Sequence, residues 1–100
     1  MIKHIVFWTL KKTAAGRSVQ DNALEIKRRL EALNGRIPGL VHLEVGIDIS
    51  RTNASADIAL YSEFADETAL AAYQAHPEHV VIADFVGEVC ESRTVVDYRV

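Results

Sequence analysis

Residues 2–10 constrain the fold most strongly, because apolar side chains point to both sides of this segment when it is extended. β-Branched and aromatic residues dominate it, as they do in β-strands. Alternate residues of a strand face opposite sides, so one face carries a histidine among large apolar side chains: Ile2, His4, Val6, Trp8 and Leu10. Ile5 and Phe7 lie on the other face. A strand with one side in water would alternate cleanly, so we expect both faces to be covered.

A helix and two further strands are predicted after this strand. Apolar residues recur at steps of three and four over residues 19–37, which predicts an amphipathic helix with Asn34-Gly35 as its C-terminal stop. The polar residues before that helix predict a loop. Residues 41–49 alternate between apolar and polar, which predicts a strand with one buried face, and residues 58–64 predict a third strand.

The last third of the chain predicts two helices and a strand. Asp66 is a candidate N-cap for a helix over residues 67–75. His-Pro at 76–77 ends that helix and begins another, because the residue before proline avoids helical geometry and proline suits the first helical position. Residues 93–100 alternate as a final strand. We therefore predict one α+β domain over residues 1–100, with the ferredoxin-like order βαββαβ and an antiparallel four-stranded sheet.

This plan leaves one face of the sheet without helices. A face in contact with water should be polar, yet the third strand carries apolar side chains on both sides, with Leu60 and Phe64 opposite Ala59 and Tyr61. Large exposed apolar patches are uncommon in monomers. Packing two such faces together around a twofold axis would bury them, so we expect a homodimer.

Charge and composition exclude several partners. The formal net charge is −3, so no basic field would attract nucleic acid or an anionic membrane. No apolar run is long enough to span a membrane, and the first apolar stretch is too short for a secretory signal. Cys90 is the only cysteine, so no intramolecular disulfide forms, which fits a reducing compartment. We expect a cytoplasmic protein.

Histidines carry the candidate chemistry. The segment His-Pro-Glu-His at 76–79 lies at a helix break, where an imidazole can sit at the mouth of a cavity. Neutral imidazole is a general base or a metal ligand near neutral pH. No cysteine or second pair completes a tetrahedral zinc set. His42 lies on the polar face of its strand and is expected to be solvated, and His76 is expected to end a helix.

Five segments occur in one order along the chain. They are Ile-Lys-His-Ile-Val at 2–6, Ile-Pro-Gly-Leu at 37–40 with Glu-Val-Gly-Ile-Asp at 44–48, Ser-Glu-Phe at 62–64, Ala-Tyr-Gln-Ala-His-Pro-Glu-His at 72–79 and Val-Val-Asp-Tyr at 95–98. Together they resemble the stress-responsive A/B barrel domain family over essentially the whole chain. Members of that family are dimeric α+β barrels with ferredoxin-like subunits, so the resemblance implies that assembly.

The resemblance also implies site residues. The chain is similar to a plant branch of the family, the olivetolic acid cyclases, which close a linear polyketide by aldol condensation. By that similarity His79 would be the base, helped by His4 and Tyr73, and Leu30 stands where those enzymes have a further pocket tyrosine. Three apolar side chains are predicted to contact the substrate: Trp8, Ile82 and Phe85.

A cation site is a further implication of the resemblance. Family members hold a cation near the end of the first helix through backbone carbonyls, which here would be those of Asn34, Ile37 and Leu40. The last carbonyls of a helix are unpaired and partly negative, and Mg²⁺ prefers oxygen ligands. No cofactor is required by the predicted chemistry, so Mg²⁺ is the only candidate.

Three functions are compatible with this sequence. The first is an enzyme of the cyclase or lyase kind, acting on a polyketide-like or aromatic substrate with His79 as base. The second is a non-catalytic ligand-binding or stress-response protein whose histidines are structural. The third is a cofactor-free monooxygenase, a class that shares the barrel. In each case we expect a homodimer with a small-molecule pocket in each subunit.

Overall fold

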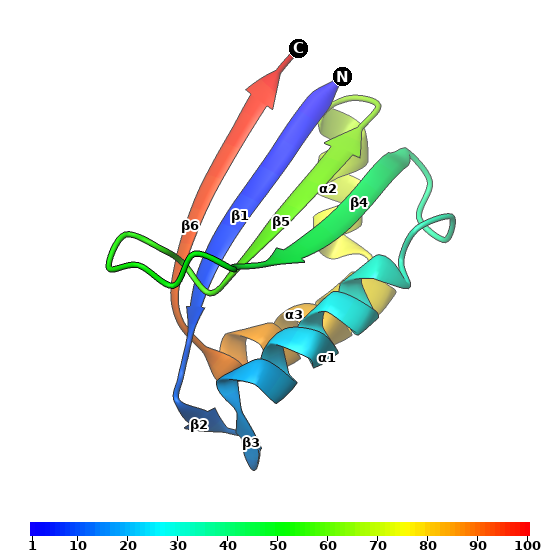
Figure 1. Ribbon diagram of the computed structural model, residues 1–100. Helices are drawn as coiled ribbons and strands as arrows, with labels where there is room; N and C mark the ends of the chain where they lie inside the picture. Colours follow the sequence, from blue (N-terminus) through cyan, green and yellow to red (C-terminus); the bar gives the residue numbers. More distant parts are fainter.

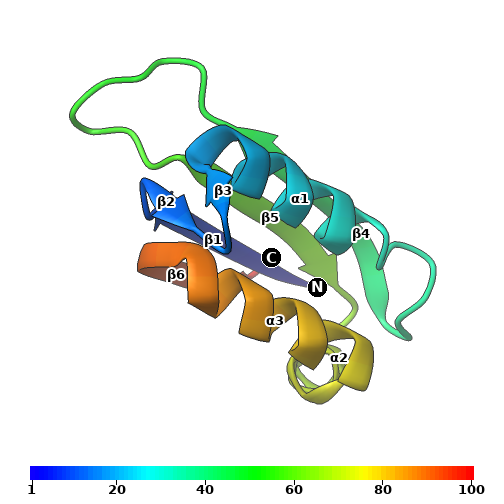
Figure 2. The same cartoon turned by 90° about the horizontal axis from the view of Figure 1, so that it is seen from below.

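The computed structural model describes residues 1–100 and has a four-stranded antiparallel sheet at its centre (Figure 1). The strand order is β4-β5-β1-β6, formed by Leu40–Ile47, Ile58–Phe64, Ile2–Leu10 and Cys90–Arg99. Three helices follow the predicted positions: α1 (Val19–Glu31), α2 (Glu67–Ala75) and α3 (Pro77–Val89). Figures 1 and 2 show all three on one face of the sheet, with α1 and α3 side by side. None of them is long and apolar enough to cross a membrane.

Side-chain caps fix where the helices begin. The Ser18 hydroxyl accepts a hydrogen bond from the Asp21 amide at 3.2 Å, and Asp66 accepts one from the Ala69 amide at 2.8 Å. His76 is the N-cap of α3, because its Nδ1 accepts from the Glu78 amide at 3.1 Å. His76 therefore ends α2 and starts α3, as predicted, and its ring is committed to that cap.

The two faces of β1 have different environments. Its five inward residues are all buried beneath the helices: Ile2, His4, Val6, Trp8 and Leu10. The register pairs His4 with Ser62 on β5 and with Asp97 on β6, so β1 is a central strand. The face that carries His4 is thus the helix-covered face.

The opposite face of the sheet has no helix over it. Phe7, Val96 and Tyr98 are 42%, 49% and 43% exposed there, and Ile5 and Tyr61 lie partly buried among them. We call these five residues the open apolar face. The bare apolar surface predicted from the sequence is therefore present.

Several element boundaries differ from the prediction. Helix α1 ends at Glu31, before Asn34-Gly35, and the last residues of its apolar stripe are buried in the turns that follow. A register shift between Leu40 and His42 displaces Val41, which is exposed. Ile49 lies beyond β4 and is 92% exposed. The expected single buried face of residues 41–49 is therefore restricted to the middle of β4.

A short hairpin occupies the region that was expected to be a loop. It consists of β2 (Thr13–Ala14) and β3 (Arg17–Ser18). Its two turn residues, Ala15 and Gly16, both have positive φ, at 51° and 72°. That geometry matches the right-handed twist of hairpin strands. The hairpin directs the chain from the end of β1 into α1.

Candidate functional site

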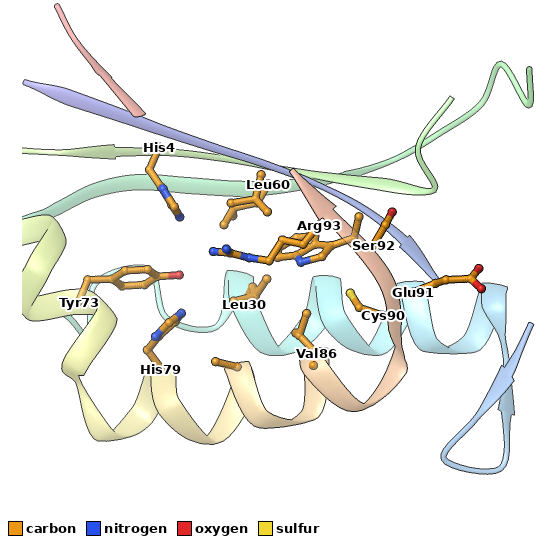
Figure 3. A pocket seen from close by; sticks show the side chains of 14 residues that line it. His4, Leu30, Leu60, Tyr73, His79, Val86, Cys90, Glu91, Ser92 and Arg93 are labelled. Atoms are coloured by element: carbon orange, nitrogen blue, oxygen red, sulfur yellow. The ribbon is translucent and has the colours of Figure 1, made fainter. Parts of the chain in front are cut away.

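A cavity of about 410 Å³ lies between the sheet and the helices (Figure 3). This size is within the range of small-molecule pockets. Strands β1 and β5 form its roof, helices α1, α2 and α3 form its floor, and the start of β6 closes one end. The lining consists of His4, Val6, Trp8, Leu30, Leu60, Tyr73, His79, Ala83, Val86, Gly87, Cys90, Glu91, Ser92 and Arg93. The cavity is mostly apolar, and His4, Tyr73 and His79 form a polar cluster at the end where β1 meets α2.

His4 is held in place by a carboxylate. Its side chain is buried on β1, and its Nδ1 forms a short hydrogen bond with Oδ1 of Asp97, which is opposite it on β6. A carboxylate in this position accepts a hydrogen bond from the Nδ1–H group and fixes the imidazole tautomer. The other ring nitrogen, Nε2, is then the one free to interact with a molecule in the cavity.

His79 presents its imidazole from the first turns of α3. Its Nδ1 donates to the carbonyl of Gln74 at 3.3 Å, which leaves Nε2 as an acceptor. Burial lowers the pKa of His79 below its ordinary value of 6.5, and the charges of His4 and Arg93 act in the same direction. His79 is therefore a neutral base at physiological pH.

Tyr73 joins the two histidines. Its ring centroid lies 4.2 Å from that of His79 and 6.4 Å from that of His4, and Figure 3 shows the three side chains pointing toward one another. The hydroxyl is buried and has no hydrogen-bond partner in the chain. Burial raises the pKa of Tyr73 well above its ordinary value of 10, so the hydroxyl remains a neutral donor. The three residues predicted to act together are thus brought together.

Two further residues belong to this site and were not predicted. Arg93 lines the cavity opposite Trp8 in the β1–β6 register, and Asp97 holds His4. The predicted alternation of residues 93–100 carries the signal, because residues 93, 95 and 97 share a face. The alternation identifies these residues only when two further facts are given: that β6 pairs with β1, and that this face lies under the helices.

The three predicted substrate contacts are only partly placed in the cavity. Trp8 lines it, and its buried indole N–H has no acceptor. Ile82 is buried in the core. The Arg29 guanidinium lies over the ring of Phe85, 4.1 Å from the centroid of that ring. Neither Ile82 nor Phe85 lines the cavity. Both residues lie on α3, where Ile82 packs in the core with Val86 and Val89 and Phe85 is partly buried against it. Leu30 does line it, where the resemblance implied a pocket position.

The cysteine that lines the cavity is unsuited to nucleophilic catalysis. Burial raises the pKa of the Cys90 thiol to about 11, so it is not a thiolate at neutral pH. His42, expected to be solvated, is half exposed on β4 and contacts Glu44 at 2.9 Å. His4, Tyr73 and His79 are the groups that lie together in the cavity and can transfer a proton.

The predicted cation ligands lie in the turn between α1 and β4. The Ile37 carbonyl already accepts the Leu40 amide at 3.2 Å, and the Asn34 side chain is occupied by two hydrogen bonds to Leu43. No group of three or more acidic, histidine or cysteine side chains is clustered to hold a metal. Only neutral backbone carbonyls would be available, so the Mg²⁺ site stays a prediction, and no step below depends on it.

Comparison with known proteins gives a consistent picture of the fold. The profile of the Stress responsive A/B Barrel Domain matches residues 2–100. No curated protein matches the chain. A dimeric protein of unknown function and ferredoxin-like fold from Bacteroides fragilis is 33% identical, with 99% of this chain and 95% of that chain covered and a TM-score of 0.87.

Two enzymes share the fold at lower identity. A hydroxynitrile lyase from Passiflora edulis is 20% identical, with a TM-score of 0.82 and coverage of 99% of this chain and 92% of that chain. An antibiotic biosynthesis monooxygenase is 18% identical, with a TM-score of 0.76 and coverage of 100% and 98%. At these identities the likeness concerns the fold and leaves the reaction open.

Proposed function

Because this chain belongs to the stress-responsive A/B barrel domain family, we propose that it is a homodimeric enzyme of the cyclase or lyase kind. Each subunit would act on a polyketide-like or aromatic small molecule in its own cavity. The observation that carries the proposal is the convergence of His4, Tyr73 and His79 on one mostly apolar cavity. A neutral base beside a neutral donor is the arrangement that proton abstraction next to a carbonyl requires.

His79 is the general base of the proposed reaction. Its Nε2 removes a proton from the substrate carbon next to a carbonyl, and the electron pair moves onto the carbonyl oxygen to form an enolate. The enolate carbon attacks a second carbonyl of the same substrate, which forms the carbon–carbon bond. The resulting alkoxide takes the proton back from His79. The same steps in reverse cleave such a bond.

His4 and Tyr73 orient the substrate and stabilise the developing charge. The Tyr73 hydroxyl has no partner in the chain, so it is free to donate to the enolate oxygen. Asp97 keeps the Nδ1 of His4 protonated, so Nε2 faces the substrate. When Nε2 takes up a proton, the carboxylate balances the charge, as an aspartate does for the histidine of a catalytic triad.

The homodimer is the assembly that the open apolar face supports. Phe7, Val96 and Tyr98 would leave water if two sheets packed face to face, and each buried Å² of apolar surface contributes about 25 cal/mol. The relative from Bacteroides fragilis is described as dimeric. The half-buried free cysteine Cys90 is consistent with a reducing compartment, so we place the protein in the cytoplasm.

The test of the catalytic role compares His79→Gln with wild type. Native mass spectrometry of the purified protein would identify co-purified ligands, and liquid chromatography–mass spectrometry would detect turnover of linear polyketide thioesters, aldols and cyanohydrins. His79→Gln should lower turnover by about 10²- to 10⁴-fold while the free energy of unfolding changes by less than about 1 kcal/mol. His42→Gln, a half-exposed histidine outside the cavity, is the matched control.

Other outcomes would redirect the assignment. Unchanged turnover in His79→Gln would remove the base from the mechanism, and a loss of several kcal/mol of stability would mark His79 as structural. Ligands that bind without turnover would favour the non-catalytic binding or stress-response function. Oxygen consumption without an added cofactor would favour the monooxygenase function.

A further inference from the structure

Three hydrogen-bond donors in the cavity have no acceptor in the chain. The indole N–H of Trp8 and the hydroxyl of Tyr73 are both buried without a partner. The Arg93 guanidinium lines the same cavity and forms no hydrogen bond or ion pair, although Glu91 also lines the cavity two residues away. Buried donors are normally paired, so the two unmatched donors of Trp8 and Tyr73 in one cavity indicate a ligand that supplies acceptor oxygens. Arg93 is exposed, and its guanidinium adds a positive charge to the lining of the same cavity.

Arg93 differs in this respect from the other arginine on its face of β6. Arg99 lies on that face, outside the cavity, and forms an ion pair with Glu67. Figure 3 shows the Arg93 side chain extending across the cavity toward His4 and Tyr73. Its positive charge acts to lower the pKa of Tyr73 and the pKa of His79. A planar guanidinium with free N–H groups matches the geometry of a carboxylate.

The rest of the lining describes the body of the ligand. Val6, Leu30, Leu60 and Val86 give the cavity apolar walls, and about 410 Å³ suits a small molecule with an aromatic or branched alkyl body. The chain as a whole has a net charge of −3, so attraction of an anion must come from the cavity and not from the overall field.

We infer that the cavity takes an apolar organic acid whose carboxylate binds Arg93, with Trp8 and Tyr73 donating to its remaining oxygen atoms. A second oxygen function, such as a ketone near the carboxylate, accounts for the donors that one carboxylate leaves unused. This inference rests on the proposed small-molecule function of the cavity and adds the substrate class. It assigns Arg93 as the residue that selects acids over their neutral analogues.

The experiment measures binding and does not require turnover. Isothermal titration calorimetry would compare 4-oxo-4-phenylbutanoate with its neutral methyl ester. Trp8 is the only tryptophan of the chain, so quenching of its fluorescence by the aryl ketone reports occupancy of this cavity. The acid should bind at least about 10-fold more tightly than the ester, as expected for a hydrogen bond to a charged group.

Substitutions on β6 locate the source of this preference. Arg93→Gln should abolish the preference for the acid, Arg93→Lys should retain part of it, and Arg99→Gln, which removes the same charge outside the cavity, should leave it unchanged. Equal binding of acid and ester, binding of neither at millimolar concentration, or a preference that survives in Arg93→Gln would overturn the inference. A protein that selects the acid through Arg93 yet turns over no substrate would refute the proposed reaction while the assignment of Arg93 stands.

Discussion

The Tyr73 hydroxyl is buried without a hydrogen-bond partner, which is unfavourable in the free protein. Tyr73→Phe removes that hydroxyl and keeps the ring that packs on His79. We expect the free energy of unfolding in urea to rise by about 1 kcal/mol, because the desolvation cost of an unpaired hydroxyl is about 1–3 kcal/mol and part of it is recovered. Turnover should fall in the same variant. A loss of stability would show that the hydroxyl is paired in the folded chain.

The lowered pKa of His79 should make the stability of the protein depend on pH. Burial lowers this pKa below the ordinary value of 6.5, so near and below pH 6.5 the unfolded chain binds more protons than the folded one. The free energy of unfolding should therefore fall as the pH drops through 6.5 toward the lowered pKa, and the contribution of His79 should be constant above that range. His79→Gln should flatten this dependence in urea titrations between pH 5 and 8.

The same imidazole should set the acid limb of the activity profile. Since protonated His79 cannot act as a base, kcat/KM should rise with pH and level off with a midpoint below 6.5. A midpoint above 6.5 would contradict the assignment of His79 as the base.

Some residues of the site could be predicted from the sequence, and others could not. The resemblance singled out His4, Tyr73 and His79, and the structure places all three around one cavity. Arg93 and Asp97 could not be found in the same way, because their importance depends on the register of β6 against β1. The alternation of the last strand separates its two faces but does not say which one lies under the helices.

At the scale of the elements, the turn between α1 and β4 depends on Gly39. Its φ is +83°, and a Cβ at this position would collide with the Cβ of Ala69 on α2. Gly39→Ala should therefore lower the free energy of unfolding by about 3 kcal/mol, from left-handed strain and the collision together. Gly35→Ala is the matched control, because Gly35 has a φ of +78° with open space around it. Its cost should be about 1–2 kcal/mol. Equal losses in the two variants would show that the contact with α2 is unimportant.

The elements themselves were largely predictable, and the exceptions have physical causes. Periodicity located the sheet strands and helices, and β5 and α2 have the predicted limits. Two-residue strands carry no periodic signal, so the β2–β3 hairpin was not predicted. The exposed Val41 follows from a register shift that the alternation of residues 41–49 does not reveal.

Across the whole molecule, β6 connects the two faces of the sheet. Arg93 and Asp97 point toward the cavity and its histidine, while Val96 and Tyr98 point to the open apolar face. The sequence indicated that one face would be bare and apolar. It did not indicate that the same strand supports both the site and the partner surface.

The oligomeric state can be tested by one substitution on that strand. Val96 is 49% exposed on the open apolar face, on the edge strand β6, and is opposite Ile5 of β1 in the register. A carboxylate there would have to be desolvated in a sheet-to-sheet dimer, which costs far more than the apolar contact it replaces. Light scattering should give about twice 11.1 kDa for the wild type and 11.1 kDa for Val96→Asp.

The control places the same substitution on the other side of the molecule. Val81 is exposed on α3, away from the open apolar face, so Val81→Asp should remain dimeric. Circular dichroism of both variants would verify that they are folded, since aspartate is also unfavourable in strands. A folded Val96→Asp that stays dimeric would place the partner elsewhere. A wild type that is monomeric at micromolar concentration would leave the open apolar face in contact with water and would refute the homodimer.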